Sequence, residues 1–287
     1  MQMTEPNPRV RLKNILFTTD FSPASDTAFP YAVTLARWFG AKLFLAHVVP
    51  PGTDANVEGA CQTAKRKMAT YIESHPAKDA VCDPIVEVGD LDGVISSVIE
   101  QHSIDLLVLG THGRQGAKKW VLGSKGEEIF HLATCPVLTV GPKVTPKPVD
   151  FEDWKPILFA TDFSDASLHA LPYALSLAEE NQASLILVHQ VALASPDRNW
   201  QEVAANWQAR LRALIPPDAG LWCSPEFVVG MDFPAAGIVQ VAAERSANLI
   251  VMGVHLASPS KVAGHFRWST AYDVVCNAHF PVLTVRA

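Results

Sequence analysis

Short apolar runs alternate with stretches of helical periodicity along the chain. The run over residues 14–19 has strand length and ends at Asp20, and Ser22 with Pro23 then suits a helix N-cap and a first helical position. Apolar residues recur at helical spacing from there to Gly40, which predicts a first helix that Pro30 should kink. We predict further strands over 42–49, 81–88, 104–109 and 136–140, and further helices over 58–75, 93–102 and 124–133. This alternation is typical of right-handed crossovers and a parallel sheet.

The second half of the chain repeats the first. Three segments carry the repeat: residues 156–164 match 14–22, residues 248–253 match 105–110, and residues 281–285 match 136–140 in every letter. We therefore predict two tandem domains over 1–141 and 154–287, joined by a proline-containing linker over 142–153. Each domain is expected to be a Rossmann-like, doubly wound α/β unit with a five-stranded parallel sheet and helices on both faces.

One proline supports a particular order of the strands in the sheet. Pro84 lies within the third strand and favours a sheet edge, which fits the order 3-2-1-4-5. Ligands of such sheets bind at the carboxyl ends of the strands where the order reverses, here between strands 1 and 4. Asp20 and the loop that begins at Gly110 should therefore lie side by side. The two identical fifth strands would leave open edges, so we expect them to lie together near a pseudo-twofold axis.

The composition narrows the class of protein. The chain has 287 residues, 48% of them hydrophobic, and a net charge of -6, so we expect a folded protein without a nucleic-acid partner. It has no apolar run of membrane length and no secretory leader pattern at its start, which favours a cytoplasmic protein without membrane association. The five cysteines form no CxxC and the ten histidines form no HxH or HExxH, so neither disulfides nor a metal site is expected.

The loop after the fourth strand carries the strongest functional pattern. Gly110 and Gly113 are followed after nine residues by Gly123 and Ser124, which opens a helix with Glu127 at the capping-box spacing. Glycines allow close approach of the backbone, and a helix N-terminus attracts anions. The basic residues of this stretch are Arg114, Lys118, Lys119 and Lys125. The loop is neither a P-loop nor a dinucleotide fingerprint, and many glycine-rich loops bind nothing, but its charge favours phosphate.

Taken together, the strand end at Asp20, the His47–Val48 pair and the Gly-x2-Gly-x9-Gly-Ser pattern resemble a tandem member of the universal stress protein family. The resemblance implies an adenine-nucleotide site for ATP, with or without Mg²⁺. It assigns Asp20 to adenine or ribose, the backbone of Val48 to the base, Gly89 to the ribose, and Gly110, Gly113, Gly123 and Ser124 to the phosphates. Beside them we take Thr19, next to Asp20, and His112, Arg114 and Lys125, in the loop, as further candidate binding residues. It also implies self-association through the fifth strands, either between the two halves or in a homodimer.

The second half departs from this pattern. Leu256 replaces the second glycine, Trp268 replaces Gly123, and the loop up to Ser269 is two residues longer, with Lys261 and Arg267 as its only full positive charges. Asp162 is retained, but a carboxylate without a phosphate loop is half a site. We therefore expect one ATP per chain, bound in the first half.

Three functions remain open at this stage. The first is an ATP-binding stress-response sensor or regulator. The second is a structural dimerisation scaffold that uses no nucleotide, and the third is a slow ATP hydrolase of the related adenine-nucleotide α-hydrolase group. No catalytic residue can be named. His47 and His189 are expected to be hydrogen-bonded structural residues, and Asp20 with Ser22 could simply cap the first helix.

Overall fold

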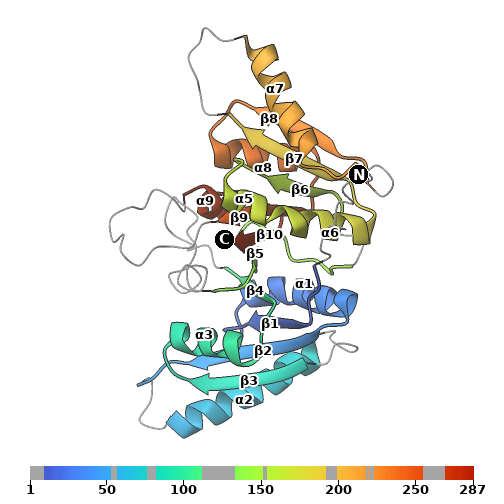
Figure 1. Cartoon of the computed structure of the whole chain (residues 1–287). Coiled ribbons are helices and arrows are strands. Elements are labelled where there is room, and N and C mark those ends of the chain that lie inside the picture. Colours follow the sequence, from blue (N-terminus) through green and yellow to red (C-terminus); the bar gives the residue numbers. More distant parts are fainter. Residues whose placement is uncertain are drawn as a thin grey trace.

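The computed structural model describes residues 10–52, 57–75, 82–111, 133–150, 154–191, 199–217, 219, 223–254 and 269–287. The strands of the first half are β1 (Asn14–Thr18), β2 (Lys42–Val49), β3 (Cys82–Val88), β4 (Leu106–Gly110) and β5 (Val137–Val140). Those of the second half are β6 (Ile157–Ala160), β7 (Leu185–Gln190), β8 (Glu226–Gly230), β9 (Leu249–Val254) and β10 (Val282–Arg286). They form one ten-stranded sheet in the order β3-β2-β1-β4-β5-β10-β9-β6-β7-β8 (Figure 1).

The described helices cover both faces of this sheet. They are α1 (Pro23–Phe39), α2 (Val57–Ser74), α3 (Leu91–Gln101), α5 (Asp165–His169), α6 (Leu171–Asn181), α7 (Trp200–Ala213), α8 (Pro234–Glu244) and α9 (Ser269–Asn277). Buried residues of α1, α2, α6 and α7 share one core cluster, and those of α3, α8 and α9 share another. The helix predicted over 124–133 lies outside the described residues, apart from Ala133.

Each half has the predicted strand order, 3-2-1-4-5, with parallel pairing inside the half. The prediction that Pro84 marks an edge is confirmed, because β3 stands at one end of the sheet and pairs with β2. The predicted α/β class and the doubly wound order are therefore both confirmed. The two predicted sheets, however, are continuous with each other and form a single sheet.

The fifth strands join the halves. β5 and β10 are antiparallel, and Leu138 pairs with Leu283, its own counterpart in the repeat. The neighbouring pairs, Val137 with Thr284 and Thr139 with Val282, exchange places under a twofold rotation, so the pseudo-twofold axis passes through the Leu138–Leu283 pair. The Thr284 hydroxyl also donates to the Val137 carbonyl at 3.2 Å. Pairing of the identical strands covers the two edges that would otherwise be exposed.

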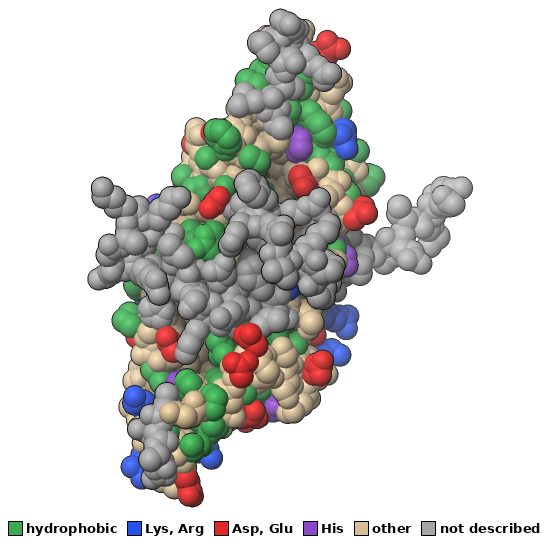
Figure 2. All heavy atoms as spheres, turned by 90° about the vertical axis from the view of Figure 1, so that its left-hand side faces the viewer, with side chains coloured by type: hydrophobic (Ala, Val, Ile, Leu, Met, Phe, Trp, Pro, Cys, Tyr) green, Lys and Arg blue, Asp and Glu red, His purple; other side chains and the backbone are tan. Residues whose placement is uncertain are grey.

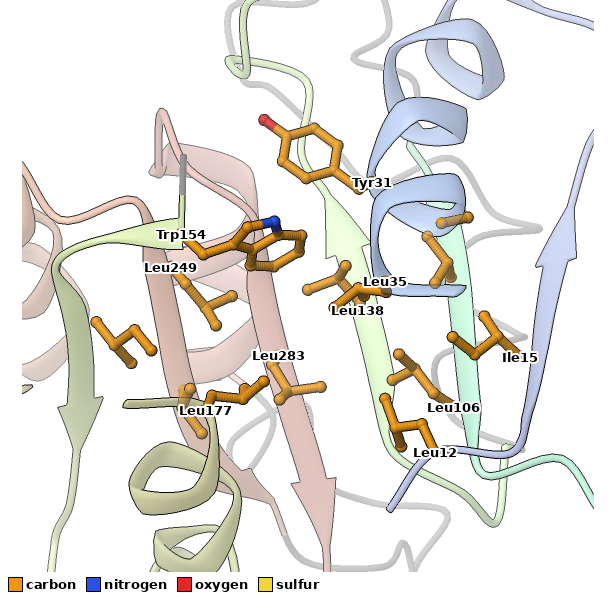
Figure 3. Packing of buried hydrophobic residues seen from close by; sticks show 14 of the residues in the cluster. Leu12, Ile15, Tyr31, Leu35, Leu106, Leu138, Trp154, Leu177, Leu249 and Leu283 are labelled. Atoms are coloured by element: carbon orange, nitrogen blue, oxygen red, sulfur yellow. The ribbon is translucent and has the colours of Figure 1, made fainter. Parts of the chain in front are cut away.

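Side chains from both halves pack over this junction on the α1 side of the sheet. Trp154 is 1% exposed, and its indole lies edge-on to Tyr31 of α1, with ring centroids 5.7 Å apart. Leu249 and Leu283 of the second half lie near the other side of the indole (Figure 3). Val144 and Val149 of the predicted linker are also buried, so its described part packs onto the protein.

The first helix differs between the halves. α1 runs unbroken through Pro30, so the proline does not interrupt it. In the second half the helix ends at His169 and restarts at Leu171, just before Pro172. A proline lacks the N–H that would bond the preceding turn, and the second half accommodates this loss by a break.

Positive and negative side chains of the described residues are interspersed over the face in Figure 2, so this part of the surface shows no continuous basic stripe. None of the described helices is both long and apolar enough to cross a membrane.

Candidate functional site

The carboxyl ends of β1 and β4 meet, as predicted from the strand order. Thr18 pairs with Leu109, so the turn at Asp20 and the loop after Gly110 leave the sheet side by side. A Cβ built on Gly110 would overlap the carbonyl oxygen of Ala24 in the first turn of α1. Glycine is therefore required here because the end of β4 lies directly against the backbone of α1.

The turn at Asp20 holds a carboxylate at this edge. Asp20 Oδ1 accepts hydrogen bonds from the Ser22 backbone N–H at 3.1 Å and from the Ser25 hydroxyl at 2.9 Å. Ser22 is the N-cap of α1 and accepts from the Ser25 N–H, so the cap predicted at this residue is confirmed. Phe21, between them, has a φ of 61°, a left-handed conformation that is costly for a bulky residue. The turn fixes the position of the exposed Asp20 side chain.

Three more predicted site residues lie at the same edge. Thr19 is buried, and its hydroxyl oxygen accepts the Phe21 N–H at 2.9 Å. Val48 is close to the end of β2, and its side chain packs against the core cluster on the α3 face. The Gly89 N–H donates to the Val49 carbonyl at 3.0 Å, which places Gly89 beside the end of β2. Together with Asp20 and Gly110, these three make five predicted residues that the structure brings to one edge.

The predicted phosphate-binding residues, except Gly110, lie outside the described residues: His112, Gly113, Arg114, Gly123, Ser124 and Lys125. The same holds for Leu256, Lys261, Arg267 and Trp268 of the second half, and for the side chain of Ser269. Their proposed roles stay predictions from the sequence.

The two strand-2 histidines have the structural role predicted for them. His47 Nδ1 and His189 Nδ1 each lie 2.8 Å from a carbonyl oxygen, that of Thr19 and Thr161 respectively, and a carbonyl requires the ring nitrogen to donate. Burial lowers the pKa of His189 below its ordinary value, although the hydrogen bond to Thr161 opposes this shift. His47 thus links the end of β2 to the turn after β1, and His189 links the end of β7 to the turn after β6.

The second half repeats the aspartate turn. Asp162 Oδ1 accepts from the Ser164 N–H at 3.0 Å and from the Ser164 hydroxyl at 2.6 Å. Burial acts to raise the pKa of Asp162, but these hydrogen bonds and one from Ser167 outweigh it, so the pKa is lowered. Asp162 is therefore an ionised turn residue that supports the N-cap Ser164.

A cavity of about 180 Å³ lies at the carboxyl ends of β6, β7 and β9. Gln190 stands on β7 where Val48 stands on β2, and its side-chain amide lies against both Gly230 and Gly237. The Gln190 Oε1 atom is buried and has no hydrogen-bond partner within the described part of the chain. The polar amide therefore occupies space in the second half beside the glycine that matches Gly89.

Sequence reasoning missed one feature of the second half. Trp207 of α7 packs against Phe163, in the turn after β6, and against His189, near the end of β7. Arg210 of α7 lies over the rings of Phe163 and Trp207. The signal was present, because residues three apart on a helix share a face and a tryptophan paired with an arginine is suited to stacking. Within the described residues, no group of three or more histidine, cysteine or acidic side chains is arranged to hold a metal ion.

Comparisons with known proteins match both halves. The model of the Universal stress protein family matches residues 11–141 and again residues 153–286. A universal stress protein of Mycobacterium tuberculosis (strain ATCC 25618 / H37Rv) is 26% identical over 301 residues, covering 95% of this chain and 96% of that protein. Universal stress protein A homolog 1 of Coxiella burnetii is 33% identical over 143 residues, covering 45% of this chain and 95% of that protein. The crystal structure of a universal stress protein from Archaeoglobus fulgidus has the same fold, with a TM-score of 0.73 at 19% identity over 95% of this chain and 98% of that one.

Proposed function

Because the chain belongs to the universal stress protein family, with one copy of the family domain in each half, we propose that it binds ATP in its first half. We propose further that it acts as a stress-response sensor or regulator in the cytoplasm. One observation carries the proposal: the turn at Asp20 meets the end of β4, where the sequence pattern from Gly110 to Ser124 begins.

The two sides of this edge suit the two parts of a nucleotide. Thr19, Asp20, Val48 and Gly89 surround the ends of β1 and β2, where a carboxylate and backbone groups can hydrogen-bond a ribose and a base. The loop that starts at Gly110 supplies glycines, a serine at a predicted helix start and four basic side chains for the phosphates. Mg²⁺ can accompany the phosphates but is not needed for this assignment.

The second half is proposed to bind no ATP. Its loop has lost two of the three glycines and has two full positive charges where the first loop has four, so fewer amides and cations can offset the desolvation of a phosphate. The Gln190 amide adds a second obstacle, because it lies against Gly230, the counterpart of Gly89.

Hydrolysis of ATP, if it occurs, is proposed to be slow, because no residue can be assigned as the base that activates water. A structural scaffold remains the second candidate function. One observation favours it: β5 and β10 pair with each other, so the halves already form an internal pseudo-dimer. Self-association of whole chains would then need another surface.

The Asp20 and Asp162 turns offer a matched test of the nucleotide site. Titration calorimetry with ATP should show weakened binding for Asp20→Ala and unchanged binding for Asp162→Ala. The second variant is the control, because each change removes a carboxylate that accepts the backbone N–H two residues further on. Gly123→Val should abolish binding, because a branched side chain would block approach of the phosphate. Equal ATP affinity in wild type, Asp20→Ala and Gly123→Val would refute the assigned site.

A further inference from the structure

The first half has a cavity beside the β1–α1 turn, on the side of the sheet that α2 covers. It has a volume of about 660 Å³, and it is bounded by the turn, the end of β2 and the first half of α2. His47 points to this side, whereas its neighbour Val48 packs on the α3 face, because alternate residues of a strand point to opposite faces. The cavity is therefore distinct from the proposed nucleotide edge, although Asp20 borders both.

One wall of this cavity is aromatic and another is made of small side chains. The rings of Phe21 and His47 lie 4.5 Å apart and form a continuous surface. Facing them, α2 contributes Ala60 and Ala64, with the exposed Lys67 at the rim. The volume falls within the range of about 300–1,000 Å³ that is usual for small-molecule sites.

The same place in the second half is filled by the protein itself. The Trp207 ring lies 4.2 Å from the His189 ring and 5.3 Å from the Phe163 ring. The guanidinium of Arg210 lies 4.2 Å above the Trp207 ring and 4.3 Å above the Phe163 ring. An indole and a cation thus cover the phenylalanine–histidine wall whose counterpart, Phe21 and His47, lines the cavity of the first half.

Alignment of α2 with α7 shows which residue makes the difference between the open and the filled space. Met68 of α2 and Leu211 of α7 are both buried against the sheet. The residue four positions earlier is Ala64 in α2 and Trp207 in α7. The residue one position earlier is Lys67 in α2 and Arg210 in α7. The first half therefore keeps the aromatic wall and the cation but has alanine where the second half has tryptophan.

We propose that this cavity binds a planar aromatic small molecule with an anionic group. Its ring takes the place that the Trp207 indole takes in the second half, stacked on Phe21 and His47. Its anion lies on the Lys67 side of the cavity, away from the Asp20 carboxylate. This site goes beyond the proposed ATP site and does not depend on it.

Indole-3-acetate is a suitable probe, because it combines an indole ring with a carboxylate. In amide-resolved NMR titrations of the full chain, it should shift the resonances of Phe21, His47 and residues 59–67, and one equivalent should bind. Lys67→Ala should weaken indole-3-acetate by about twofold to fivefold, as expected for a partly exposed ion pair, while Lys67→Arg retains binding. Uncharged indole should bind wild type and Lys67→Ala equally, which separates the charge from the ring.

Two exchanges between the halves give the decisive comparison. Ala64→Trp should fill the cavity and abolish binding of indole-3-acetate, while thermal stability and ATP affinity stay as in wild type. Trp207→Ala should open the matching space in the second half and raise the stoichiometry from one to two. If Ala64→Trp does not fold, Ala60→Leu provides a smaller obstruction and should also weaken binding.

Three results would overturn the proposal. The first is unchanged probe binding in the folded variant that fills the cavity. The second is absence of NMR shifts at α2 with saturating probe. The third is displacement of the probe by ATP, which would place the probe in the nucleotide site. Failure of ATP binding alone would leave this proposal intact.

Discussion

Trp154 provides a quantitative test of how the two halves are joined. It is among the largest fully buried side chains described. Its indole packs against Tyr31 of the first half, and Leu249 and Leu283 of the second half lie near its other side (Figure 3). Replacing a buried tryptophan by alanine usually costs about 3–5 kcal/mol, because contacts are lost and a cavity remains. The indole Nε1 is buried without a hydrogen-bond partner among the described residues, so its removal returns part of a desolvation penalty of roughly 1–3 kcal/mol. We therefore expect Trp154→Ala to cost about 3 kcal/mol, at the lower end of the range.

Urea unfolding followed by far-ultraviolet circular dichroism measures this loss. With an m-value of roughly 3 kcal/mol per M, the unfolding midpoint should fall by about 1 M. Trp154→Phe is the matched control, since it keeps a ring against Tyr31 and removes the unpaired N–H, and it should cost less than about 1 kcal/mol. A midpoint for Trp154→Ala within about 0.3 M of wild type would refute the reasoning that this indole holds the halves together.

Two further predictions concern the second half. Gly253→Ala should lower the melting temperature, because a Cβ there would overlap the Ala166 carbonyl and overpacking costs about 1–3 kcal/mol; an unchanged melting curve would show that the backbones can separate. His189 has a pKa below the ordinary 6.5, owing to burial, so its contribution to stability is complete above pH 6.5 and is lost as pH falls through the lowered pKa. Urea midpoints at pH 7 and pH 5 should therefore differ less in His189→Gln than in wild type, and equal differences would contradict the buried, neutral state of His189.

The sequence was sufficient for the order of the strands. The alternation of apolar runs with helical segments is a local pattern, and Pro84 marks an edge because it cannot donate within a ladder. The repeat then predicted the meeting of the fifth strands, which the Leu138–Leu283 pair confirms. Juxtaposition of Asp20 and Gly110 followed from topology alone.

Other features depended on contacts that no local pattern contains. The role of Gly110 as a close contact of α1 could not be separated from a role in ligand binding, because both require the absence of a Cβ. The position of the Gln190 amide became visible only when β7 and α8 were seen to converge on it from Gly230 and Gly237. The break between α5 and α6, just before Pro172, was equally unexpected, since the corresponding Pro30 is accommodated inside α1.

The stoichiometry of ATP binding tests the central claim most directly. Equilibrium dialysis of the full chain against saturating ATP should give one equivalent per chain in wild type and in Asp162→Ala, and none in Gly123→Val. Two equivalents in wild type, with one that survives Gly123→Val, would contradict the claim that only the first half binds the nucleotide.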